Sequence, residues 1–99
     1  MSGDSYAHLA VLTLDLHIPA SQSLKTKRMA LKSLKDRVRG KFNVSIAEIG
    51  EQDKWQRSEI AVCMVGNDKQ YVEGALQSVL DYVREERAVS LIDSSIEFV

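Results

Sequence analysis

An alternating stretch near the start of the chain places the strongest constraint on its fold. Residues 6–18 alternate strictly between two faces, and one face is almost purely aliphatic. That face carries His8, Ala10, Leu12, Leu14, Leu16 and Ile18. A period of two is typical of a β-strand, and an aliphatic face of this length has to be covered by a second layer. The other face turns polar at Asp15 and His17, so we predict a long strand with one face fully covered and one half covered.

A helix is expected to follow this strand. Pro19 cannot donate a ladder hydrogen bond and therefore closes the strand. Ser21 or Ser23 then offers a side-chain oxygen as N-cap for a helix that ends near Gly40. The apolar positions with helical spacing are Leu24, Leu31, Leu34 and Val38.

The second half of the chain is expected to contain two strands, a helix and a last strand. Residues 42–49 and 57–65 read as strands joined by a turn at 50–54, which makes a hairpin. Residues 60–65 are apolar at every position, which predicts a central strand covered on both faces or nearly so. Asn67 or Asp68 caps a second helix, and residues 89–99 form a fourth strand broken around 93–95. The second helix has one apolar face, with Val72, Ala75, Leu76, Val79 and Val83.

This order of elements predicts an α+β fold of the ferredoxin-like type, a split β-α-β sandwich with the order βαββαβ. Two interleaved right-handed crossovers place the first and third strands in the middle of a four-stranded antiparallel sheet, with both helices on one face. The opposite face of the sheet is then open to a partner. At 99 residues, the chain is expected to be a single domain spanning residues 1–99.

Composition excludes several protein classes. With 44% hydrophobic and 27% charged residues, the chain resembles neither disordered nor low-complexity proteins. The longest apolar run, residues 60–65, is far shorter than the ~20 residues of a membrane helix, and the first residues do not resemble a secretion signal. Because Cys63 is the only cysteine, no internal disulfide is possible. We therefore expect a cytoplasmic protein without a membrane partner.

The basic residues are concentrated in the first predicted helix. Residues 25–41 hold eight of the 13 basic residues and only one acid, Asp36, for a charge of +7, whereas the remainder of the chain carries −8. At ~100° per residue, five of these cations fall within a sector of ~80° beside the apolar stripe. We call this set, Lys25, Arg28, Lys32, Lys35 and Arg39, the basic ridge. Such a surface suits polyanions, since each cation that neutralises a phosphate releases counterions. The alternative is a solvated helix face that keeps the chain soluble.

Lys27 points into the apolar sector of the same helix. We expect its stem to cover the rim of the core while its ammonium reaches water.

Few residues suggest catalysis or metal binding. Asp15 and His17 share a strand face that Glu48 or Glu59 could approach, but without a metal-binding spacing pattern we expect only a surface hydrogen-bonding pair. Cys63 lies in the most apolar strand and is expected to be a buried hydrophobe. There is no glycine-rich phosphate loop. We therefore expect a protein that is not an enzyme and has neither a cofactor nor a metal site.

The only tryptophan lies in or beside the turn of the hairpin. Trp55 could fold back over the open sheet face, which we favour, or stand exposed as a stacking platform for a base or a partner. Arg57 is expected to pair with Asp53 or Glu59, with a phosphate contact as the alternative.

Four ordered motifs resemble the YlxP-like family of small bacterial proteins, which is classed as a domain of unknown function. They are Leu-x-Leu-His-Ile-Pro at 14–19, Ser-Leu-Lys-x-Lys-Arg at 23–28, Phe-Asn-Val-Ser-x-Ala-Glu at 42–48 and Gln-Asp-x-Trp-Gln-Arg at 52–57. The resemblance spans about residues 7–98 and implies a ferredoxin-like fold. The family's genes often lie beside those for translation initiation and ribosome maturation, which implies a connection with RNA or the ribosome. It does not imply an activity.

Two functional hypotheses follow. The first is a non-enzymatic accessory module that docks structured RNA or a ribosomal particle through the basic ridge, with Lys27, Trp55 and Arg57 as further contacts. Base stacking on the sheet itself is disfavoured, because residues 59–65 contain no aromatic side chain. The second is a protein-interaction module or homodimer that uses the open sheet face around Leu9, Val11, Ala61 and Cys63.

Overall fold

The computed structural model describes residues 6–99 and contains the six predicted elements in the predicted order. They are β1 (His8–His17), α1 (Leu24–Lys41), β2 (Ser45–Gly50), β3 (Arg57–Gly66), α2 (Lys69–Arg84) and β4 (Ser90–Phe98). Neither helix is long and apolar enough to cross a membrane within the described residues.

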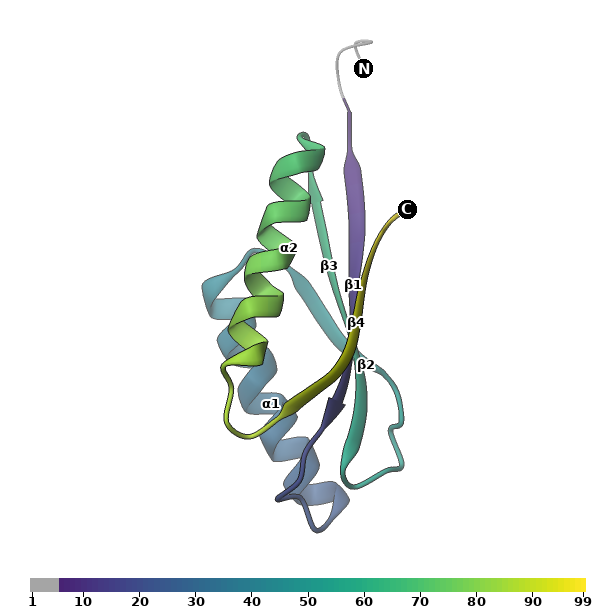
Figure 1. The fold of residues 1–99 in the computed structure, drawn as a ribbon, viewed down its shortest axis with the longest axis vertical. Coiled ribbons are helices and arrows are strands. Elements are labelled where there is room, and N and C mark those ends of the chain that lie inside the picture. Colours follow the sequence, from purple (N-terminus) through teal and green to yellow (C-terminus); the bar gives the residue numbers. More distant parts are fainter. Residues whose placement is uncertain (1–5) are drawn as a thin grey trace.

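The four strands form one antiparallel sheet in the order β2-β3-β1-β4. Both helices lie on the same side of this sheet (Figure 1). The structure therefore confirms the ferredoxin-like arrangement, including the central positions of the first and third strands. The face turned away from the helices is not covered by any described segment, and we call it the open sheet face.

The core lies between the helices and the covered face of the sheet. The predicted aliphatic residues of β1 are buried from Ala10 to Leu16, as is Ile18 just after the strand, and β3 buries Ile60, Val62 and Met64. The helices contribute Leu31, Leu34 and Val38 from α1 and Val72, Leu76, Val79, Leu80 and Val83 from α2. Apolar side chains that recur every two residues in the strands and about every 3.6 residues in the helices thus meet in one layer, as the sequence pattern predicts.

Both helices start at a capping side chain. Of the two candidates for α1, Ser23 is the N-cap, because its hydroxyl accepts a hydrogen bond of 3.1 Å from the Thr26 amide. Ser21 is buried instead and donates to the carbonyl of Ser23. Asp68 caps α2 by accepting from the amides of Gln70 and Tyr71.

The prediction that residues 60–65 are covered on both faces or nearly so is wrong. Ala61 and Cys63 are only half buried, and Val65 is 61% exposed, since they lie on the open sheet face. Cys63 is therefore not the fully buried hydrophobe that we expected. The run is apolar at every position because one face packs in the core and the other lies on the open sheet face, which also carries apolar side chains here.

Strand ends also differ from the prediction. Strand β2 begins at Ser45, because Phe42 forms the C-cap of α1 and donates its amide to the carbonyl of Val38. In β4 the pairing with β1 shifts between Leu91 and Asp93, leaving Ile92 without a partner. This irregularity falls one residue before the predicted break.

The end of β3 has no space for a larger residue, which gives a test of the packing. A Cβ added at Gly66 would lie 2.8 Å from Cγ2 of the buried Val72, so Gly66→Ala is expected to lower the free energy of unfolding by ~1–3 kcal/mol. Gly74, in the middle of α2, has open space around it, and Gly74→Ala is expected to raise the same quantity by ~0.5–1 kcal/mol. Urea denaturation measures the free energy of unfolding of both variants. If Gly66→Ala and Gly74→Ala changed it by the same amount, the packing described for β3 and α2 would be contradicted.

Candidate nucleic-acid interface

The basic ridge occupies the outward side of α1. The apolar stripe of the helix, which includes Leu31, Leu34 and Val38, is buried against the sheet layer. Among the ridge residues, Lys35 is half buried, and Lys25, Arg28, Lys32 and Arg39 are exposed. Side chains spaced by three and four residues thus form a continuous row of cations along the helix.

Within the described residues, Asp36 is the one carboxylate that pairs with ridge cations, and it pairs with two of the five. Asp36 accepts a hydrogen bond of 2.7 Å from the Lys32 ammonium and lies 3.4 Å from the Arg39 guanidinium. Arg39 also donates to the carbonyl of Ile46. Within residues 6–99, Lys25, Arg28 and Lys35 form no ion pair, so most of the ridge charge is not neutralised by a direct partner.

The ridge changes the chemistry of Asp36. The hydrogen bond from Lys32 lowers the pKa of the Asp36 carboxyl, and the positive charges of Lys32, Arg39 and Lys35 lower it further. Because the pKa is lower in the folded chain, the stabilisation from these contacts is present at neutral pH. It is lost in acid, as the pH falls through the lowered pKa.

The prediction for Lys27 is wrong, because its ammonium does not reach water. The side chain is completely buried, at 0% exposure. Its Nζ donates to the carbonyls of Glu51 at 2.6 Å and Lys54 at 2.7 Å, and it lies 2.9 Å from Oε2 of Glu48. The three donors of the ammonium therefore have three acceptors, one of them charged, which offsets the cost of removing the ion from water. Lys27 is consequently not available to bind a phosphate.

The acceptor of this buried cation was detectable in the sequence. Glu48 follows Ile46 by two residues and therefore shares the covered face of β2. Its carboxylate also accepts a hydrogen bond of 2.7 Å from the hydroxyl of the buried Ser58. A lysine in the apolar sector of a helix and a glutamate on the covered face of a strand predict such a pair, although neither residue does so alone.

The structure places Trp55 and Arg57 differently from the favoured predictions. Trp55 does not pack over the open sheet face but stands 56% exposed in the loop between β2 and β3. Arg57 pairs with Asp15, at 3.0 and 3.1 Å to its two carboxylate oxygens, rather than with Asp53 or Glu59. Arg57 lies directly opposite His17 in the antiparallel pair, so Asp15 is its diagonal neighbour on β1, a relation that sequence separation does not reveal.

The acidic groups of the open sheet face form no metal site. Asp15, Glu59 and Asp93 border a hollow of about 220 Å³, but the guanidinium of Arg57 lies on Asp15. No group of three histidine, cysteine, aspartate or glutamate side chains within residues 6–99 is arranged to hold an ion.

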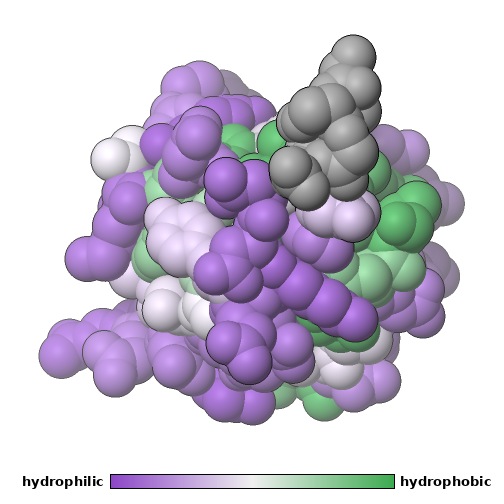
Figure 2. All heavy atoms as spheres, turned by 90° about the horizontal axis from the view of Figure 1, so that it is seen from above, coloured by the Kyte–Doolittle hydropathy of each residue, from purple (hydrophilic) through white to green (hydrophobic). Residues whose placement is uncertain are grey.

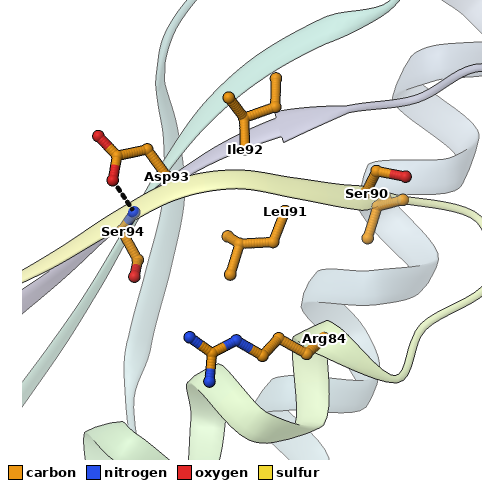
Figure 3. Close-up of a pocket in the computed structure, with 7 residues that line it drawn as sticks. Arg84, Ser90, Leu91, Ile92, Asp93 and Ser94 are labelled. Atoms are coloured by element: carbon orange, nitrogen blue, oxygen red, sulfur yellow. Dashed lines mark hydrogen bonds between the residues drawn. The ribbon is translucent and has the colours of Figure 1, made fainter.

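A second hollow, of about 630 Å³, lies between the end of α2 and β4 (Figure 3). Arg84 and Leu91 point into it, whereas the Asp93 carboxylate turns to the other side of the strand and accepts the amide of Ser94. The hollow therefore presents the Arg84 guanidinium beside the aliphatic side chain of Leu91.

The upper half of the open sheet face is apolar. Leu9 and Val65 are exposed beside the half-buried Val11, Ala61 and Cys63. Figure 2 shows hydrophobic surface on the right, the side of the sheet that points away from the helices in Figure 1. The molecule thus has two contrasting surfaces, a cationic helix and a partly apolar sheet.

Comparisons with known proteins agree with the sequence motifs. A family model described as "Protein of unknown function (DUF503)" matches residues 9–96. The chain is similar to a protein of Bacillus subtilis (strain 168) called "Uncharacterized protein YlxP", with 48% identity over 61 residues. That alignment covers 62% of this chain and 66% of the relative. Because the family model matches nearly the whole folded region, this chain belongs to the DUF503 family, of which the YlxP-like proteins are members.

Proposed function

We propose that this protein is a non-enzymatic accessory module that binds structured RNA, alone or within a ribosomal particle, through the basic ridge. The observation that carries the proposal is the row of five cations on α1, of which only Lys32 and Arg39 have a carboxylate partner, Asp36, within residues 6–99. Five aligned cations repel one another by a few tenths of a kcal/mol per pair, a cost that solubility alone does not require.

The ridge suits the spacing of phosphates. Lys25 and Arg39 are separated by 14 residues of helix, or ~21 Å at the rise of an α-helix. This length spans several phosphates of one RNA strand. Contacts of this kind position the RNA and carry little sequence information, so shape is expected to decide which RNA is bound.

Reversing two ridge charges tests the proposal. We expect the wild-type protein to bind an RNA hairpin with a steep salt dependence. The double variant Lys32→Glu with Lys35→Glu should bind more weakly, and its slope of log K against log salt should be smaller by about two. Lys69 and Arg84 serve as the control, since both lie on the side of α2 next to β4. Lys69→Glu with Arg84→Glu changes the net charge by the same amount as the ridge pair and should leave the salt slope of RNA binding unchanged. Binding that ignores salt, or equal effects of both pairs, would reject the proposal.

Removing the carboxylate of the ridge gives the opposite test. Asp36→Asn frees Lys32 and Arg39 from their partner, and we expect it to strengthen RNA binding and to steepen the salt dependence. Asp81→Asn is the matched control, because Asp81 holds Arg84 in a similar exposed contact on α2. Unchanged affinity of the Asp36 variant would indicate that the ridge does not contact phosphate.

The apolar half of the open sheet face favours a second candidate function, self-association. Leu9 and Val65 are exposed side by side on paired positions of β1 and β3, next to Val11 and Cys63. A second copy of the chain could cover this surface in an isologous dimer, with the basic ridge acting only to keep the protein soluble.

Sedimentation distinguishes this candidate. If the open sheet face is a dimer interface, the protein sediments as a dimer at micromolar concentration, and Val65→Lys shifts it to monomer because a charge enters the apolar contact. Tyr71→Lys, at a similarly exposed position of α2, should have no effect. A wild-type monomer at high micromolar concentration would reject self-association.

A further inference from the structure

The loop between β2 and β3 is attached to the rest of the protein at both of its ends. Lys27 donates to the carbonyls of Glu51 and Lys54, at 2.6 and 2.7 Å. The Gln56 side-chain amide donates to the carbonyls of Pro19 and Ser21, at 3.2 and 3.1 Å. The backbone carbonyl of Gln56 also accepts the amide of Ile18 at 2.9 Å. The loop is therefore fixed against the start of α1, although every one of its side chains is exposed.

Trp55 lies between these two attachment points. Trp55 is 56% exposed, while the residues on either side of it are bonded to the body of the protein. A mobile loop would allow so large an apolar ring to fold onto the neighbouring surface, because burial of apolar area is favourable. The attachment of the loop keeps the indole accessible and reduces the entropy lost when a ligand stacks on it.

The Trp55 loop is attached to the end of α1 at which the basic ridge begins. Lys27, which holds the loop, belongs to the first turns of α1, and Lys25 and Arg28 flank it in the sequence as exposed cations without an ion pair in residues 6–99. An accessible aromatic plane at the same end of the molecule as unpaired cations suits single-stranded nucleic acid, because the ring stacks on a base and the cations bind phosphates.

We propose that Trp55 is a stacking site for an unpaired RNA base, and that Lys27 is a positioning residue that holds the Trp55 loop at the end of α1 that carries Lys25 and Arg28. This inference rests on the proposed function and adds to it the kind of RNA that is bound. A paired base in a helix exposes no face for stacking, so the preferred ligand is a hairpin loop, bulge or single strand joined to a duplex.

Trp55 reports on its own site, because it is the only tryptophan of the chain. Two RNA probes are titrated at fixed salt, a hairpin with an unpaired uridine loop and a blunt duplex of the same length. We expect the hairpin to quench Trp55 fluorescence and the duplex to bind through the basic ridge with little quenching. Trp55→Ala should weaken hairpin binding by about tenfold, leave duplex binding unchanged and leave the salt slope unchanged, since no phosphate contact is lost. Tyr71→Ala removes a similarly exposed aromatic ring from α2 and should change neither affinity.

The positioning role of Lys27 requires a variant that does not leave a buried charge. Lys27→Met with Glu48→Gln removes both charges, and the amide carbonyl introduced at position 48 would still accept the hydroxyl of Ser58. We expect this double variant to lower the fluorescence anisotropy of Trp55 and to weaken hairpin binding as much as Trp55→Ala does, while duplex binding is retained. Gln56→Ala is the milder second variant, because it removes the side-chain bonds to Pro19 and Ser21 at the other end of the loop without touching a buried charge. It should also lower the anisotropy and weaken hairpin binding, and unchanged values would overturn the role of loop attachment.

The outcomes separate this inference from the proposed function. Salt-dependent binding of both RNAs without quenching, or with Trp55→Ala equal to wild type, overturns the stacking site and leaves the RNA-binding role of the ridge intact. Unchanged anisotropy and affinity in a folded Lys27 and Glu48 double variant overturn the positioning role. Absence of binding to either RNA overturns both proposals, and Trp55 is then exposed for a protein partner.

Discussion

The helices cover only one face of the sheet, and this one-sided contact determines which surfaces of the protein remain exposed. The aliphatic side chains of β1 and β3 bury only on the helix side, together with the apolar stripes of α1 and α2. The outward side of α1 is then free to carry cations at close spacing, and the opposite side of the sheet is free to remain partly apolar. Both candidate interfaces are thus consequences of one-sided burial, a feature of layered α+β folds in general.

The elements and their order could be predicted from the sequence, because periods of two and 3.6 are long and regular here. The alternation in β1, the caps at Ser23 and Asp68 and the covered positions of α2 all have local causes, so a local pattern reveals them. The prediction failed where a residue depends on a distant partner. Residues 60–65 are apolar on both faces, and only the three-dimensional structure shows that one face is uncovered.

The surroundings of Lys27 also depend on distant partners. Its acceptors lie 21, 24 and 27 residues away in the chain, and two of them are backbone carbonyls that every residue possesses. Helical spacing correctly places Lys27 in the apolar sector, but it does not say whether a charged side chain there escapes to water or is satisfied internally. Trp55 is exposed for the same reason, since the bonds that fix its loop come from α1 and from the segment after β1. The position of the basic ridge, by contrast, was predictable, because it depends on one helix alone.

The irregularities of the two outer strands bear on how the protein behaves at high concentration. Strand β4 has an unpaired residue at Ile92 followed by an acidic side chain, and the short strand β2 shifts its pairing between Glu48 and Gly50. Bulges and charges at these positions interrupt the row of free amide and carbonyl groups that would otherwise template another strand. Both edges of the sheet therefore disfavour edge-to-edge aggregation, and the addition of a strand from another molecule is disfavoured even at high protein concentration.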